Sequence, residues 1–288
     1  MKHFFVIINR EKEGTREVSA DIHRYLTEHG ATCVIDQTDP SLMKEGYTDI
    51  RQLPKDTDCV IVLGGDGTLL QAANDLSDAS VPFLGINFGT LGFLSEINQG
   101  EVYEALDRML ADDYQIEERM MISGRIFSEG ERIDQHASLN DIVITRKGSL
   151  KILCLSVYIN GLLINRYHSD GIIAATPTGS TGYSLSAGGP IINPVSRMIM
   201  LTPICPHTMH DRSILFSEED EVEIHIDHAR DGSEQIMEAI FDGSHKVGLK
   251  TGDRVLIRAS EKTTGIVKLR QESFLTTLRK KLKDDASE

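Results

Sequence analysis

The first part of the chain alternates between two spacings of apolar residues. Runs of apolar residues predict buried strands over 3–8, 31–36, 58–63 and 81–87. Apolar residues three or four positions apart predict helices over 14–29, 69–76 and 101–110. Strands and helices in alternation are typical of a parallel sheet with helices on both faces. Ligands of such sheets bind at the carboxyl ends of the strands, so we expect a site there.

From about Met120 the pattern changes to short strands that follow one another. They are predicted over 121–127, 138–145, 152–159, 162–167, 171–175, 198–201, 222–226, 235–241 and 254–259. Turn sequences such as Asn160-Gly161 separate several of them, which indicates an all-β second domain. Apolar residues at helical spacing then predict a helix over 272–283, which we expect to return to the first domain.

A chain of 288 residues is long enough for two ordinary domains. We expect an α/β domain over 1–115, an all-β domain over 116–268 and a C-terminal helical segment over 269–288.

Charge and cysteine content exclude some classes of function. The formal net charge of −14 argues against general nucleic-acid binding, which needs basic surfaces. No apolar run is long enough to cross a bilayer, and no signal peptide opens the sequence. The cysteines form no CxxC pair, and Cys33, Cys59 and Cys154 lie in apolar runs typical of buried free thiols. We expect a cytoplasmic protein with no nucleic-acid or membrane partner.

The strand predicted over 58–63 ends in the motif Gly64-Gly65-Asp66-Gly67-Thr68. Three glycines allow a backbone to press closely against a ligand. Thr68 is predicted to be the N-cap of the next helix, whose N-terminus would attract a phosphate. A loop that only bound phosphate would gain little from the carboxylate of Asp66 at its centre. The acid suggests a base directed at a hydroxyl, or a metal ligand beside phosphates.

A second motif, over 176–190, is dominated by hydroxyls and glycines. Pro177, Tyr183 and Leu185 are unusual in a flexible linker, so we expect this segment to be ordered. Hydroxyl and backbone N–H groups suit the oxygens of sugars and phosphates, and Tyr183 can stack on a ring.

Shorter motifs provide weaker candidates. His168 and Asp170 are two residues apart, so on one strand they would point to the same face. Asn140-Asp141 and Asp242-Gly243-Ser244 are also ordinary turn sequences, and Lys151 has the alternative of being a solvated surface charge. The sequence contains no GxxxxGK[ST], HExxH or GxSxG motif and no dinucleotide-binding GxGxxG followed by an acid, which argues against P-loop ATPases and hydride-transfer enzymes.

Taken together, the two long motifs resemble those of the bacterial NAD kinase family, and the similarity runs through almost the whole chain. The first motif alone is shared with diacylglycerol-type lipid kinases and, more loosely, with phosphofructokinases. The resemblance implies a Rossmann-like α/β domain followed by a β-sandwich domain, and a homo-oligomer, either a dimer or a tetramer. It implies transfer of the γ-phosphoryl group of ATP to the 2′-hydroxyl of the adenosine ribose of NAD. It also implies Mg²⁺, or another divalent metal, held mainly by the ATP phosphates rather than by protein ligands.

The resemblance also assigns roles to individual residues. It makes Asp66 the general base and places Gly67 against the ligand. Asn140 and Asp141 would hold the adenosine part of NAD, while His168 and Asp170 would lie near the nicotinamide half. The remaining expected binding residues are Lys151, Thr178, Ser180, Thr181, Gly182, Tyr183, Ser184, Leu185 and Ser186.

Three positions depart from the family pattern. The family usually has Glu where this chain has Asp141, Ala where it has Gly182, and Gln where it has Ser244. The shorter Asp141 side chain reaches one methylene less far, and Ser244 lacks the amide group of the glutamine usual in the family.

Two alternative functions stay open on the sequence alone. A lipid kinase would share the first motif, although the chain offers no basic amphipathic surface and the second motif would have no role. A non-catalytic dinucleotide sensor would keep the fold, although it would have no use for the base Asp66. The sequence does not distinguish ATP from polyphosphate as donor, or NAD from NADH as acceptor.

Overall fold

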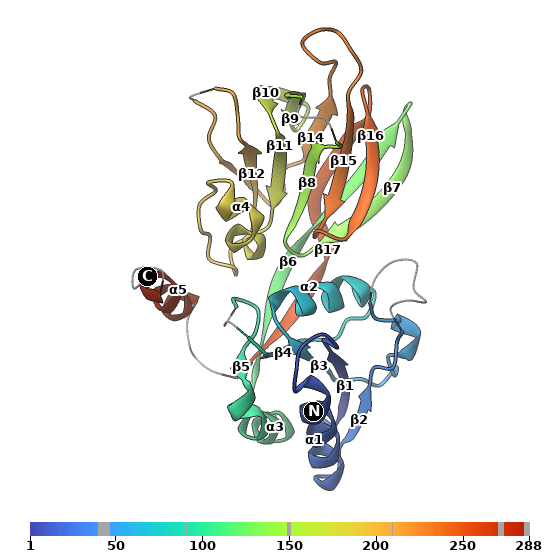
Figure 1. Cartoon of the computed structure of the whole chain (residues 1–288), viewed down its shortest axis with the longest axis vertical. Helices are drawn as coiled ribbons and strands as arrows, with labels where there is room; N and C mark the ends of the chain where they lie inside the picture. Colours follow the sequence, from blue (N-terminus) through green and yellow to red (C-terminus); the bar gives the residue numbers. More distant parts are fainter. Residues whose placement is uncertain (40–46, 90–91, 149–150, 209, 270–273, 285–288) are drawn as a thin grey trace. The chain divides into compact units, whose positions relative to one another are not determined.

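The computed structural model describes residues 1–39, 47–89, 92–148, 151–208, 210–269 and 274–284. The chain forms two compact units (Figure 1). The first unit comprises Met1–Glu118 and Thr264–Glu288, and the second comprises Arg119–Thr263. The strands β6 (Gln115–Ser128) and β17 (Arg254–Lys268) contribute residues to both units.

The first unit is built on a parallel sheet with the strand order β4-β3-β1-β2. Its strands are β1 (His3–Ile8), β2 (Thr32–Ile35), β3 (Cys59–Gly64), β4 (Phe83–Asn87) and the short β5 (Ile97–Asn98). The helices are α1 (Thr15–Glu28), α2 (Asp66–Asp75) and α3 (Val102–Leu110), with 3₁₀ turns η2 (Ile50–Gln52) and η3 (Gln99–Glu101). Every residue of β3 is buried, as a central parallel strand covered on both faces requires.

The helix α5 (Phe274–Asp284) belongs to the first unit. Its Phe274 ring lies 5.6 Å from the ring of Phe93, and the Lys281 ammonium lies 5.0 Å from the same ring. The prediction that the C-terminal helix returns to the first domain is confirmed, although the first two residues of the predicted helix, 272–273, lie outside the described part of the chain.

In its described residues the second unit consists of β-strands apart from the 3₁₀ turn η4 (Thr178–Thr181) and the short helix α4 (Tyr183–Ser186). One antiparallel sheet has the order β13-β12-β11-β8-β15-β16. Its strands are β8 (Asp141–Arg146), β11 (Gly171–Ala175), β12 (Met198–Ile204), β13 (Ile214–Ser217), β15 (Ile236–Phe241) and β16 (His245–Lys250). The other strands of the unit are β7 (Glu131–Ser138), β9 (Leu153–Ile159), β10 (Leu162–Ser169) and β14 (Val222–Ile226), together with parts of β6 and β17.

Both sheets of the second unit contribute to one apolar core. Ile144 and Ala174 come from the first sheet, and Leu155 and Ile224 from the other. Apolar side chains from two facing sheets define a β-sandwich. An α/β domain followed by a β domain is therefore confirmed, as are the buried free thiols of Cys33, Cys59 and Cys154.

Candidate functional site

The glycine motif forms a tight turn between β3 and α2. Gly65 is the N-cap of α2, so the helix begins earlier than the sequence predicted, and the assignment of Thr68 as N-cap is wrong. The Thr68 hydroxyl instead accepts hydrogen bonds from the Gly65 N–H (3.4 Å) and from Asn9 Nδ2 (3.0 Å). A Cβ at Gly64 would lie 2.4 Å from this hydroxyl, so the turn closes only with glycine there.

The Asp66 carboxylate is fixed by the segment that follows β4. Its Oδ2 accepts a hydrogen bond from the Phe93 N–H (2.6 Å), and its Oδ1 accepts from the Ser95 N–H (3.1 Å) and hydroxyl (3.0 Å). A Cβ at Gly92 would lie 1.9 Å from Oδ1, so this approach needs a glycine. A carboxylate has about four lone-pair sites, and these contacts leave one of them open on Oδ2.

One cation lies against the glycine loop. Lys12, from the loop after β1, donates through Nζ to the Phe88 carbonyl (2.9 Å). The same Nζ is 3.2 Å from the position that a Cβ would take at Gly65 and at Gly89. An ammonium group here, beside the N-terminus of α2, favours a bound anion.

Asn140 and Asp141, at the start of β8, are held by Asp242. The Asp242 carboxylate accepts hydrogen bonds from the N–H groups of Leu139 (2.7 Å), Asn140 (2.8 Å) and Asp141 (2.8 Å). Asp242 (φ 45°) and Gly243 (φ 72°) form the turn between β15 and β16, and positive φ at both residues is typical of a type I′ hairpin. The turn therefore carries a carboxylate that positions the Asn140-Asp141 pair.

The Asn140-Asp141 pair has unusual electrostatics. Burial, and then the charge of Asp242, raise the pKa of Asp141 to about 7. Asn140 Oδ1 is buried and has no hydrogen-bond partner among the described residues. A Cβ at Gly182 would lie 3.6 Å from Asn140 Nδ2 and 3.9 Å from Asp141 Oδ2, so these residues come together. They offer an unused acceptor beside a carboxyl that is partly protonated near neutral pH.

The hydroxyl-rich motif is ordered, as 3₁₀ turn η4 (Thr178–Thr181) and helix α4 (Tyr183–Ser186). Much of its hydroxyl content is used internally. The buried Thr176 donates to the Leu139 carbonyl (2.6 Å), and Ser180 donates to the Pro177 carbonyl (2.7 Å) and accepts from the Ile192 N–H (3.0 Å).

Other members of the same motif are divided between the interior and the surface. Ser184 contacts the Thr202 hydroxyl at 3.0 Å and is fully buried, and the Thr178 hydroxyl accepts from Arg119 (3.4 Å). Tyr183 and Leu185 are exposed, Ser186 is exposed, and Thr181 and Gly182 are half-buried. The surface members are the ones that a ligand can reach.

His168 and Asp170 do not share a strand, so the prediction that they point to one face is wrong. β10 ends at Ser169 in one sheet, and β11 begins at Gly171 in the other. The His168 ring lies 3.3 Å from the Cys154 thiol, and burial lowers the pKa of His168. Asp170 is paired with Arg146.

Asp170 and Asp141 lie at opposite ends of the β8–β11 pair. In this pair Ala175 is opposite Asp141 and Gly171 is opposite Thr145. Asp170 precedes Ala175 by five residues, so it lies about 17 Å along the strand direction from Asp141. Within one chain the structure brings Asn140, Asp141 and Gly182 together but not His168 and Asp170; Lys151 is exposed.

Comparison with known proteins gives this arrangement a context. Residues 4–114 match the model of the ATP-NAD kinase N-terminal domain, and residues 139–269 match that of the ATP-NAD kinase C-terminal domain. The chain belongs to the ATP-NAD kinase family. The resemblance predicted from the two motifs is confirmed.

Relatives and solved structures agree with membership in the ATP-NAD kinase family. The chain is 43% identical to an NAD kinase of Lachnoclostridium phytofermentans, over 99% of this chain and 100% of that protein. It is 44% identical to an NAD kinase of Agathobacter rectalis, over 98% and 99% of the two chains. Its fold is similar to that of yeast NADH kinase complexed with NADH (TM-score 0.81, 23% identity, 97% and 86% coverage). It is also similar to an NAD kinase from Archaeoglobus fulgidus in complex with ATP (TM-score 0.77, 22% identity, 98% coverage of both chains).

Sequence reasoning missed several polar residues around the site of this ATP-NAD kinase family member. Asn9 and Asn87 lie at the carboxyl ends of β1 and β4, where a parallel sheet places its ligands, so their position was a usable signal. Asn87 is buried, and its Oδ1 has no partner within the described ranges. The position of Lys12 carried no local pattern, and Asp242 was marked only by the turn sequence Asp242-Gly243-Ser244, which did not reveal its contacts with the Asn140-Asp141 pair.

In the part of the chain that the structure describes, no group of three or more His, Cys, Asp or Glu side chains could hold a metal ion. Among the same residues, no helix has the length and apolar character to cross a membrane.

Proposed function

We propose that this protein is an NAD kinase, which transfers the γ-phosphoryl group of ATP to the 2′-hydroxyl of the adenosine ribose of NAD. Its relatives named NAD kinase and its two family domains support this activity. The observation that carries the proposal is the Asp66 carboxylate, fixed by three hydrogen bonds with one lone pair left on Oδ2.

Asp66 acts as the general base in this proposal. Its free Oδ2 lone pair takes the proton of the 2′-hydroxyl while the ribose oxygen attacks the γ-phosphorus and the bond to the β-phosphate oxygen breaks. A positioned base contributes about 10²- to 10⁴-fold to such a reaction. The three hydrogen bonds prevent the carboxylate from rotating, so its orientation is set before substrate binds. Lys12 and the N–H groups at the start of α2 balance the charge of the phosphates.

We assign the adenosine part of NAD to Asn140 and Asp141. Asn140 Oδ1 is an unused acceptor for an adenine amino or ribose hydroxyl group. With a pKa of about 7, the Asp141 carboxyl can donate or accept a hydrogen bond. The exposed ring of Tyr183 provides a stacking surface, and Thr181, Gly182, Leu185 and Ser186 are accessible beside it.

The other predicted contacts complete the proposal. His168 and Asp170 are assigned to the nicotinamide half of NAD and Lys151 to the phosphates. Three predicted binding residues hold the 176–190 segment in its conformation instead of contacting NAD directly, because their hydroxyls already have partners in the protein. They are Thr178, Ser180 and Ser184. We also propose a cytoplasmic homo-oligomer that serves NADP biosynthesis.

Mg²⁺ neutralises phosphate charge in phosphoryl transfer. The described residues provide no carboxylate cluster that would hold this ion alone, so we propose that it arrives on the triphosphate.

The test uses Asp66→Asn in the full chain with ATP, Mg²⁺ and NAD. We expect turnover to fall at least about a hundredfold while NAD binding, measured by calorimetry, is retained. Near wild-type turnover would refute the assignment of the base. If the wild-type protein binds NAD but forms no NADP, it is a sensor rather than a kinase, and phosphorylation of a diacylglycerol in place of NAD would indicate the lipid-kinase alternative.

A further inference from the structure

A pocket of about 480 Å³ lies in the first unit, at the carboxyl ends of β1 and β2. Its walls include Asn9, Asp36, Tyr47 and Gln71, together with Gly67 and Thr68 of the glycine loop. In this sheet β1 and β3 are neighbours. The chain runs from β1 to β2 on one side of this pair, and from β3 to β4 on the other side. Such a switch point is where open α/β sheets bind their ligands.

A buried carboxylate in this wall has one unused oxygen. Asp36 is 8% exposed, and its Oδ1 accepts hydrogen bonds from the N–H (3.0 Å) and the hydroxyl (2.6 Å) of Thr38. Its Oδ2 has no hydrogen-bond partner among the described residues. The carboxylate is thus held in the wall by Oδ1, and Oδ2 can accept a hydrogen bond from a donor on a ligand in the pocket.

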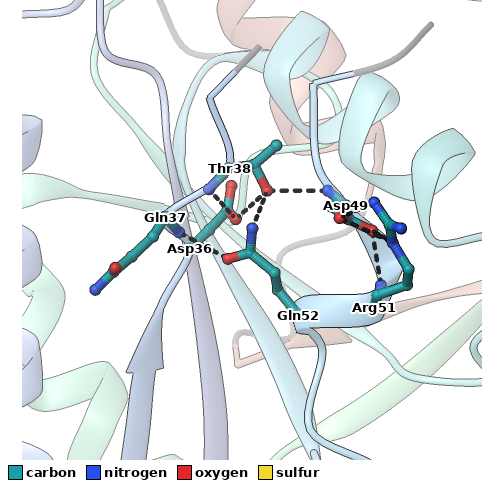
Figure 2. A network of polar contacts seen from close by, with 6 residues as sticks. All are labelled: Asp36, Gln37, Thr38, Asp49, Arg51 and Gln52. Atoms are coloured by element: carbon teal, nitrogen blue, oxygen red, sulfur yellow. Dashed lines mark hydrogen bonds and ion pairs between the residues drawn. The ribbon is translucent and has the colours of Figure 1, made fainter. Parts of the chain in front are cut away.

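A network of polar contacts fixes this orientation (Figure 2). The Thr38 hydroxyl, which donates to Asp36, accepts from the Asp49 N–H (3.0 Å) and from Gln52 Nε2 (3.1 Å). The Gln52 side chain also accepts from the Gln37 N–H (3.2 Å). Thr38 therefore has no freedom to move to the other oxygen, and Oδ2 stays available to the pocket.

An aromatic ring lies in another part of the wall. Tyr47 is 61% exposed, and its backbone N–H donates to Asp75 Oδ2 (2.7 Å), as does that of Thr48 (2.8 Å). Asp75 is on α2 and also accepts from Gln71 (2.7 Å). The backbone that carries the ring is thus anchored to the helix that begins at Asp66. A carboxylate acceptor and an exposed ring in one pocket suit a ribonucleoside, whose hydroxyls donate and whose base stacks.

We propose that this pocket binds the nucleoside of the phosphoryl donor, with Asp36 Oδ2 accepting a hydrogen bond from a ribose hydroxyl. This assignment rests on the proposed kinase activity. Gly67 and Thr68 belong both to the pocket wall and to the loop that carries Asp66, so a triphosphate attached to the nucleoside leads toward the catalytic carboxylate. The donor is accordingly a ribonucleoside triphosphate rather than inorganic polyphosphate, which has neither ring nor sugar hydroxyls.

The test is Asp36→Asn, compared with wild type in steady-state assays of NADP formation. The asparagine oxygen will keep the two donors of Thr38, so its NH₂ group will face the pocket and replace the acceptor by a donor. We expect KM for ATP to rise about tenfold or more, with KM for NAD and kcat within about twofold of wild type. Wild type should prefer ATP over 2′,3′-dideoxy-ATP about tenfold or more, and the variant should lose this preference.

Asp49→Asn is the matched control. It removes an acid from the same network, but the Asp49 carboxylate contacts Arg51 and is not part of the pocket wall. It should leave KM for ATP unchanged. An unchanged KM for ATP in Asp36→Asn, a rise in KM for NAD instead, or equal use of polyphosphate and ATP by wild type would overturn the assignment. Failure of wild type to form NADP with any donor would instead refute the kinase activity.

Discussion

Asp242→Asn isolates the contribution of one carboxylate to the geometry of the Asn140-Asp141 pair. The asparagine oxygen can keep the hydrogen bonds from Asn140 and Asp141, which both go to Oδ1. Its NH₂ group then faces the Leu139 N–H, so the 2.7 Å bond to Oδ2 becomes a contact between two donors. Hydrogen bonds to a charged group contribute about 1.5–3 kcal/mol, so we expect the free energy of unfolding to fall by about 2–3 kcal/mol. Asparagine tolerates the positive φ of this position, so the hairpin itself should be unstrained.

Urea denaturation and steady-state kinetics measure the two consequences of this change. KM for NAD should rise while kcat changes less, because Asp66 is untouched. Asp231→Asn is a matched control, since Asp231 begins a second Asp-Gly-Ser turn, is exposed, and accepts hydrogen bonds from the nearby Ser233. It should unfold like wild type with an unchanged KM. Wild-type stability and wild-type KM in Asp242→Asn would refute the positioning role.

Two further substitutions test the electrostatics and the packing of the site. The pKa of Asp141 is raised to about 7 in the folded protein, whereas an aspartate in the unfolded chain has a pKa near 4. Between about pH 4 and pH 7 this carboxyl therefore ionises in the unfolded chain before it ionises in the folded protein, so the free energy of unfolding falls as pH rises. Asp141→Asn should remove this loss, so its free energy of unfolding at about pH 8 should exceed that of wild type by on the order of 4 kcal/mol. The difference should shrink toward about pH 4, and equal unfolding curves for the two proteins at both pH values would contradict this. Gly92→Ala places a methyl group 1.9 Å from Asp66 Oδ1 and should lower kcat about a hundredfold, as Asp66→Asn does. Gly100→Ala, where a Cβ meets nothing within 4 Å, is its control, and wild-type kcat in Gly92→Ala would show that Asp66 does not need its observed position.

Central strands were predictable from the sequence, as were the edge strands β2 and β10 of the larger sheet, whereas both edge strands of the six-stranded sheet were missed. The run predicted over 58–63 is β3, all of whose residues are buried, so every position had to be apolar or small. β13 and β16 are the two edges of the six-stranded sheet, and neither was predicted. In β16 only Leu249 is buried, so its sequence carries almost no apolar periodicity.

The candidate site was predictable where its residues are neighbours in the chain. Asp66 was found because three glycines surround it in sequence. Asp242 contacts residues 101 to 103 positions away, and Lys12 contacts a carbonyl 76 positions away. Such contacts depend on how the strands are ordered, and no local pattern contains that order.

The internally bonded hydroxyls of Thr176, Ser180 and Ser184 also bear on the thermodynamics of recognition. A loop that becomes ordered only around its ligand loses conformational entropy in the binding step, which weakens the complex. Here the segment is tied to Leu139, Ile192 and Thr202 by its own side chains, so its ordering belongs to folding. The abundance of serine and threonine in this motif thus reflects preorganisation: in the proposed function, NAD would bind to a surface whose shape is set when the protein folds.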